Sequence, residues 1–169
     1  RLFPDSKLIN ESPDIVKDIS HANSIHKIYI CGMPTVTRMK RGDIIVIYRT
    51  GDGQGPAHYR AVASTLCVVE SVKTIDDFRN EDSFVEYCLR FSVFSEEELR
   101  CFYKDKRYPY VIRFSYNISL PKRPNRATLI DQVGLNDARE FRWSHFQLTD
   151  EQFFKIIELG RINESFIIH

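Results

Sequence analysis

Tyr48, Arg49 and Thr50 stand where a predicted strand, residues 43–49, meets the glycine-rich loop RTGDGQGP. Side chains at strand ends line the mouths of small β-barrels, where ligands bind. An arginine at such a mouth can stack on a base or fork to a phosphate. Arg49 is equally consistent with a surface or structural ion pair. The segment therefore predicts either the rim of a ligand pocket or a plain hairpin turn.

The same loop does not have the features of a phosphate-binding loop. A Walker loop continues as Gly-Lys-Ser/Thr into a helix, and a dinucleotide fingerprint also opens a helix. Here the glycines are followed by Pro56 and by another predicted strand. Nucleotide binding of either kind is disfavoured.

Basic residues gather in three short segments that could contact a nucleic-acid backbone. They are Arg38, Lys40 and Arg41; Lys104, Lys106 and Arg107; and Lys122, Arg123 and Arg126. The formal net charge is only +1, so nucleic-acid binding requires a local patch rather than a broad basic field. If two of these segments converge beside the barrel mouth, they would contact a phosphate backbone. Otherwise each segment is an ordinary solvent-exposed surface.

Cysteines and histidines give no sign of a metal or cofactor site. The four cysteines form no CxxC pair, and the five histidines are scattered without a recognisable nucleophile partner. Cys31, Cys67 and Cys88 lie in apolar runs, as core residues of a reduced compartment do. With no signal peptide and no long apolar run, the sequence predicts a cytoplasmic protein with no cofactor and no membrane contact.

Local patterns predict an α+β fold of 169 residues. Residues 1–24 read as a linker or N-terminal extension with a short helix near 14–18, and residues 25–169 as one domain. Strands are expected at 25–33, 43–49, 58–72 and 108–120, and helices within 74–90 and 95–103, before Gly134 and from 150 to Gly160. Ser95 with Glu98, and Thr149 with Gln152, form capping boxes. The simplest packing is a partly open β-barrel with helices at its ends.

Four stretches together resemble the PUA-like superfamily, in particular its EVE branch, whose relatives include the YTH and ASCH domains. These stretches are Lys40–Thr50, Ala61–Val72, Ser92–Tyr103 and Pro109–Ser119. LFPD, residues 2–5, is similar to the junction of bacterial proteins in which a GNAT acetyltransferase precedes a PUA-like module. The chain begins without Met, so we expect it to be part of a longer protein.

The resemblance implies a pseudo-barrel of about five to six mixed strands that binds RNA or DNA and holds a modified base between aromatic walls. Its implied ligand-binding residues are Tyr29, Tyr48, Arg49, Thr50, Tyr59, Thr65 and Trp143, with Tyr116 and Phe94 as further ring candidates. The backbone contacts expected from the basic segments are Arg38, Lys40, Arg41, Lys122, Arg123 and Arg126. Trp143 is the sole tryptophan, which excludes a cage of several tryptophans as in YTH domains. Trp143 and Thr65 are also consistent with ordinary core packing.

Some ASCH-like enzymes use a Lys, Thr and Glu constellation, for which this chain offers Lys40 or Lys27, Thr65 and Glu70. The ASCH signature itself is missing, and Glu70 is also consistent with the solvent side of a half-buried strand. Binding is therefore favoured over catalysis. The alternative function is an interaction or small-ligand sensor module that regulates a fused acetyltransferase.

Overall fold

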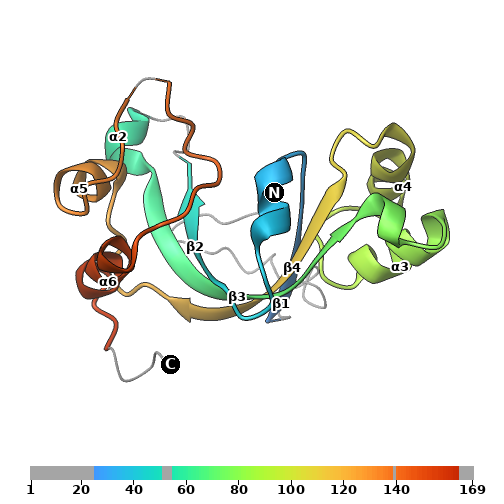
Figure 1. Cartoon of the computed structure of the whole chain (residues 1–169), viewed down its shortest axis with the longest axis horizontal. Coiled ribbons are helices and arrows are strands. Elements are labelled where there is room, and N and C mark those ends of the chain that lie inside the picture. Colours follow the sequence, from blue (N-terminus) through green and yellow to red (C-terminus); the bar gives the residue numbers. More distant parts are fainter. Residues whose placement is uncertain (1–24, 51–54, 139, 164–169) are drawn as a thin grey trace, which may run out of the picture. The chain divides into compact units, whose positions relative to one another are not determined.

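The computed structural model describes residues 25–50, 55–138 and 140–163 and has an α+β fold (Figure 1). Its strands are β1 (His26–Cys31), β2 (Ile44–Arg49), β3 (Val62–Thr74) and β4 (Tyr110–Ser119), in the sheet order β1-β4-β3-β2. β1 and β4 are antiparallel, with His26 opposite Ser115 and Cys31 opposite Tyr110. The described residues thus form four strands, fewer than the five or six that the resemblance implies.

The helices are short and fall between the strands or after the last one. They are η2 (Pro34–Arg38), α2 (Ala57–Arg60), η3 (Ile75–Asp77), α3 (Glu81–Leu89), α4 (Glu96–Asp105), α5 (Arg126–Asp131) and α6 (Asp150–Leu159). Of these described helices, none is long and apolar enough to cross a membrane. The predicted helix near residues 14–18 and the predicted linker 1–24 lie outside the described residues, as do residues 51–54 of the glycine-rich loop.

The chain divides into two compact units, and each unit takes two separate stretches of sequence. Unit 1 holds the described parts of residues 1–43 with 68–116, and unit 2 holds those of residues 44–67 with 117–169. β3 and β4 each run from one unit into the other. Each unit has its own apolar core, so each is described by itself.

In unit 1 the core lies between α3, α4 and one face of the sheet. Phe84 and Leu99 are fully buried there, and Ile28 and Val111 reach them from β1 and β4. α3 and α4 lie side by side (Figure 1). Among the charged contacts, Arg100 of α4 reaches α3 at the Oε1 of Glu81, 3.0 Å away, and at the Oδ1 of Asp82, 2.9 Å away.

In unit 2 the core is built from α5, α6 and the ends of β3 and β4. It includes Leu129 of α5, Ile156 and Ile157 of α6, and Leu120 after β4, all nearly inaccessible to solvent. The pattern of apolar residues in 153–157 predicted this buried side of α6 correctly.

The predicted capping boxes of α4 and α6 are both present. The Oγ of Ser95 accepts from the Glu98 amide at 3.2 Å, and the Glu98 carboxylate accepts from the Ser95 amide at 2.9 Å. Thr149 and Gln152 exchange the corresponding bonds at 3.2 and 3.1 Å. Both helices therefore begin where the sequence predicted, because these bonds satisfy amides that a helix start leaves unpaired.

Gly160 ends α6 as predicted, although for a packing reason. Its φ is −72°, which any residue adopts. A Cβ at this position would lie 2.8 Å from Cδ2 of Leu120 and 3.0 Å from the carbonyl oxygen of Ile156. The absence of a side chain, rather than a left-handed backbone, is what the site requires.

Two predicted boundaries are wrong. β3 begins at Val62 rather than at residue 58, because residues 57–60 form a helical turn in which the Ala57 carbonyl accepts from the Ala61 amide at 2.9 Å. The helix expected within 74–90 is two elements. Thr74 and Asn80 were alternative caps for one predicted helix. In the structure Thr74 caps η3 and Asn80 caps α3.

Candidate functional site

Unit 2 brings Tyr48, Arg126 and Trp143 together from three segments that are far apart in the sequence. The Tyr48 and Trp143 ring centroids are 5.0 Å apart with an interplanar angle of 40°, and the Arg126 guanidinium lies 4.8 Å from the Trp143 ring centroid. Phe141 and Phe146 meet Trp143 edge-on at 6.4 and 5.9 Å. We call these five residues the Trp143 cluster.

Backbone contacts fix the elements that carry this cluster. Tyr48 lies near the end of β2, where the Ser64 hydroxyl of β3 donates to the preceding carbonyl, that of Ile47, at 3.2 Å. Arg126 is the first residue of α5, and its amide donates to the Ala61 carbonyl at 2.8 Å. The Asn125 side chain caps α5 by accepting from the Thr128 amide at 2.9 Å. The backbone positions of Tyr48 and Arg126 therefore follow from sheet pairing and helix capping.

The Trp143 cluster contains two buried hydrogen-bond donors without a partner in the described part of the chain. They are Nε of Arg126 and Nε1 of Trp143. An Nη of Arg126 lies 3.6 Å from the Asp137 carboxylate, at a site where the Arg126 side chain is 26% exposed. Buried donors are normally paired, because an unpaired one keeps the desolvation penalty of about 1–3 kcal/mol. An acceptor atom of a planar ligand could therefore pair with these two donors.

Burial also affects the Tyr48 hydroxyl. It raises the pKa of Tyr48 above its ordinary value, and the charge of Arg126 opposes part of that shift. The phenol consequently stays protonated at neutral pH and can donate a hydrogen bond. The cluster thus offers aromatic rings, one cation and neutral donors, which suits a nucleobase with its acceptor atoms.

The other predicted ligand-binding residues of unit 2 occupy varied positions. Arg49 is half-buried at the end of β2, Thr50 is exposed, and Tyr59 is 65% exposed on α2. Thr65 is buried in β3, where its hydroxyl lies 3.4 Å from that of Ser64. Of these four residues, Thr65 is buried, which agrees with the alternative that it packs in the core.

Two predicted backbone-contact residues of unit 2 are exposed. Lys122 and Arg123 lie in the loop that leads into α5. Three neighbours of the cluster were not predicted from the sequence: Phe141 and Phe146, which contact Trp143, and Asp137, which lies beside Arg126. The only local signal is the aromatic spacing in FRWSHF, residues 141–146, which also fits ordinary core packing.

The remaining predicted site residues belong to unit 1. Tyr29 is half-buried in β1 opposite Ile112, and burial raises its pKa. Arg38, Lys40 and Arg41 are exposed around the turn that leads to β2. The predicted site residues are therefore divided between the two units.

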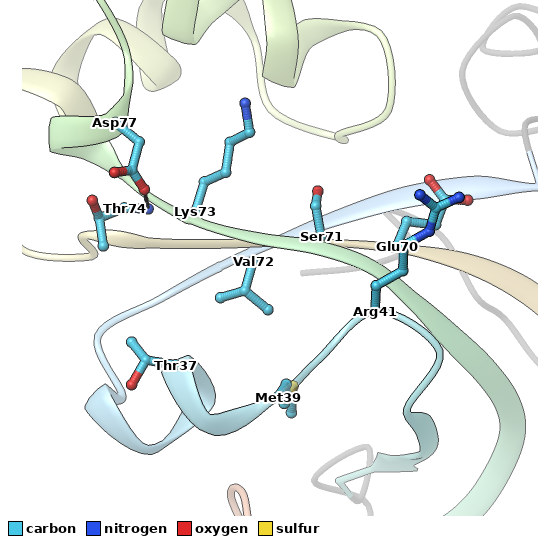
Figure 2. Close-up of a pocket in the computed structure, with 9 residues that line it drawn as sticks. All are labelled: Thr37, Met39, Arg41, Glu70, Ser71, Val72, Lys73, Thr74 and Asp77. Atoms are coloured by element: carbon cyan, nitrogen blue, oxygen red, sulfur yellow. Dashed lines mark hydrogen bonds between the residues drawn. The ribbon is translucent and has the colours of Figure 1, made fainter.

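Unit 1 has a groove of about 460 Å³ beside β3 (Figure 2). It is lined by Thr37, Met39, Arg41, Glu70, Ser71, Val72, Lys73, Thr74 and Asp77. Figure 2 shows Lys73 and Val72 pointing to opposite sides of the strand, with Val72 toward Thr37 and Met39.

Most polar groups of the groove already have partners inside unit 1. The Ser71 and Tyr87 hydroxyls are 2.9 Å apart, and the Lys73 ammonium lies 4.8 Å from the Tyr87 ring centroid. The Asp77 carboxylate accepts from the Thr74 amide at 2.6 Å, and this bond lowers the pKa of Asp77. The groove consequently gives less support for ligand binding than the Trp143 cluster.

Glu70, a member of the considered Lys, Thr and Glu constellation, has other partners. Its carboxylate lies 2.5 Å from Nδ1 of His26 and 2.6 Å from Nε of Arg113, which joins three neighbouring strands. The Arg113 contact is a close ion pair rather than a well-aligned hydrogen bond. The Arg113 guanidinium also lies 4.6 Å from the centre of the Phe91 ring. This arrangement, the Glu70 ion cluster, could not be read from the sequence because its members are far apart in the chain.

The two lysines considered with Glu70 differ in environment. Lys27 is 4% exposed, and burial lowers its pKa, whereas Lys40 is exposed. Thr65 belongs to unit 2, while Glu70 belongs to unit 1. The constellation therefore has no support as a single site in either unit.

Within the described ranges, no group of His, Cys, Asp or Glu side chains could hold a metal ion. Cys31, Cys67 and Cys88 are buried as predicted, and Cys101 is exposed. Burial raises the pKa of Cys67 and Cys88 to about 12, so both are neutral thiols at physiological pH.

Comparisons with protein-family models, with curated proteins and with solved structures each find no match for this chain.

Proposed function

We propose that the chain is a nucleic-acid-binding module that holds a base of RNA or DNA, including a modified base, at the Trp143 cluster. Tyr48 and Trp143 supply the aromatic surface, and Arg126 supplies a cation beside it. Further, we propose that the fold is a PUA-like pseudo-barrel of the EVE kind in a cytoplasmic protein. The fold proposal is supported by the four sequence stretches that resemble this family. The cytoplasmic proposal is supported by the three buried, free cysteines.

The observation that carries the proposal is the convergence of Tyr48, Arg126 and Trp143 with two buried donors that lack partners. A structural tryptophan would be expected to pair its indole N–H when buried. A base offers ring nitrogens and carbonyl oxygens that accept hydrogen bonds, and its face stacks on aromatic or guanidinium planes. Because Arg126 lies over Trp143, a bound base would stack beside the guanidinium.

The charge distribution near the cluster supports a modest electrostatic contribution. Lys122 and Arg123 are exposed in the loop before α5, close in sequence to Arg126. With a net charge of +1 for the whole chain, we expect base stacking to supply much of the affinity. We also expect binding to weaken as the salt concentration rises. This dependence should be shallow, because only a few phosphates would be contacted.

The test is fluorescence anisotropy with labelled single-stranded RNA and DNA, with and without modified bases, at low salt. Arg126→Gln should weaken binding about tenfold or more, because it removes the cation that lies over Trp143. Arg90→Gln is the matched control, because Arg90 is exposed on unit 1 and pairs only with Glu86 in the described structure. Equal affinities of the two variants, or no binding by the wild type, would contradict the proposal.

A further inference from the structure

Tyr59 is the most exposed of the large hydrophobic residues in the described part of the chain. It is 65% exposed, compared with 42% for Ile44 and 40% for Phe154 in the same unit. The His58 ring meets it edge-on at 4.9 Å with an interplanar angle of 89°. A T-shaped contact covers at most one face of the tyrosine ring, so His58 leaves the other face unoccupied.

The turn that carries Tyr59 is fixed to the Trp143 cluster through the backbone. The Pro56 carbonyl accepts from the Tyr59 amide at 3.1 Å, and the Ala57 carbonyl accepts from the Ala61 amide at 2.9 Å. Ala61 is fully buried, and its carbonyl accepts from the Arg126 amide at 2.8 Å. α2 and α5 pack against each other within unit 2 (Figure 1). Tyr59 therefore has a defined position relative to Arg126.

Polar and basic residues surround Tyr59 in the sequence and across the α2–α5 contact. His58 and Arg60 flank it, and Arg126 begins the helix opposite. A docking surface for an apolar protein partner would instead be a contiguous apolar patch. Proteins bind single-stranded nucleic acids with aromatic side chains that stack bases and with nearby positive charge. The exposed Tyr59 ring with Arg60 beside it in the chain supplies both components.

We infer that Tyr59 stacks a second base, so that the ligand of this module is a single strand of at least two nucleotides. This inference rests on the proposed function, because it assumes that the Trp143 cluster binds the first base. Bases within a duplex are already stacked on their neighbours and cannot lie on a protein ring, so an intact duplex should bind more weakly.

The experiment measures the affinities of a mononucleotide, a single-stranded hexanucleotide and a hairpin duplex for the wild type, Tyr59→Ala and Tyr59→Phe. Tyr59→Ala should weaken hexanucleotide binding by about 5- to 150-fold, which is the effect of losing one base–aromatic stack. It should leave mononucleotide binding unchanged. Tyr59→Phe keeps the ring and should bind the hexanucleotide like the wild type. Circular dichroism melting confirms that the variants fold.

The outcomes separate this inference from the function on which it rests. Hexanucleotide binding that is unchanged in Tyr59→Ala but weakened in Arg126→Gln would overturn the second stacking site and leave the first intact. Equal binding of duplex and single strand would also overturn it. If the wild type binds none of the three nucleic acids, the proposed function fails as well.

Discussion

Replacing Glu70 by Gln should destabilise the protein through the Glu70 ion cluster. The substitution removes the charge that lies 2.5 Å from His26 Nδ1 and 2.6 Å from Arg113 Nε. The Arg113 side chain is 29% exposed, so its charge would remain partly buried with its carboxylate partner gone. We therefore expect a clear loss of folding free energy.

The expected magnitude follows from the geometry. Hydrogen bonds to charged groups contribute about 1.5–3 kcal/mol each. The Glu70 side chain is 25% exposed, and water screens part of that interaction. About 2 kcal/mol for the whole cluster is the resulting expectation, equivalent to a fall in melting temperature of roughly 4–8 °C for a domain of this size.

Glu86→Gln is the matched control for this prediction. Glu86 pairs with Arg90 at 3.2 Å, with side chains 74% and 69% exposed, so its loss should cost about 0.5 kcal/mol or less. Urea denaturation followed by circular dichroism measures both variants. Equal stabilities of Glu70→Gln and Glu86→Gln would refute the view that partial burial makes the Glu70 ion cluster a stabilising element.

Three further predictions concern packing, pH and thiol accessibility. Gly160→Ala should cost about 1–3 kcal/mol in urea denaturation, because its Cβ would lie 2.8 Å from Leu120; unchanged stability would show that this contact relaxes freely. Burial lowers the pKa of His145, so the unfolded chain binds the proton more tightly and stability should fall as pH drops below about 6.5. Melting curves of His145→Gln should show a smaller fall over that range, and identical pH dependence would contradict it. Under native conditions a thiol reagent should modify Cys101 rapidly and the three buried cysteines slowly, whereas rapid modification of all four would contradict their burial.

Local signals predicted the elements of this fold well. The capping boxes at Ser95 and Thr149 marked helix starts correctly, because a capping box satisfies backbone amides within a few residues of sequence. The start of β3 was predicted wrongly, because HYRAVASTLCVVESV, residues 58–72, was interpreted as one continuous strand. The bond between Ala61 and Arg126 that accompanies the helical turn joins residues too distant for local patterns to reveal.

The members of the candidate site were predicted only in part, because residues far apart in the sequence form it. Tyr48 and Trp143 were expected to line one pocket, whereas Arg126 was expected only as a backbone contact, and no signal in the sequence placed it at the Trp143 ring. The pairing of Glu70 with His26 and Arg113 depends on the order of strands in the sheet, which a single sequence does not determine. Local propensity predicted the helices and strands, whereas the contacts between distant residues could not be predicted from a single sequence.

The most direct test of the central claim uses Trp143 itself. Because the chain contains a single tryptophan, its intrinsic fluorescence reports on the Trp143 cluster without a label. A titration with a single-stranded hexanucleotide should quench this emission in a saturable manner, and Arg126→Gln should shift the midpoint to about tenfold higher concentration or more. A Trp143 spectrum that stays unchanged at concentrations where anisotropy shows full binding would place the nucleic acid elsewhere and contradict the account.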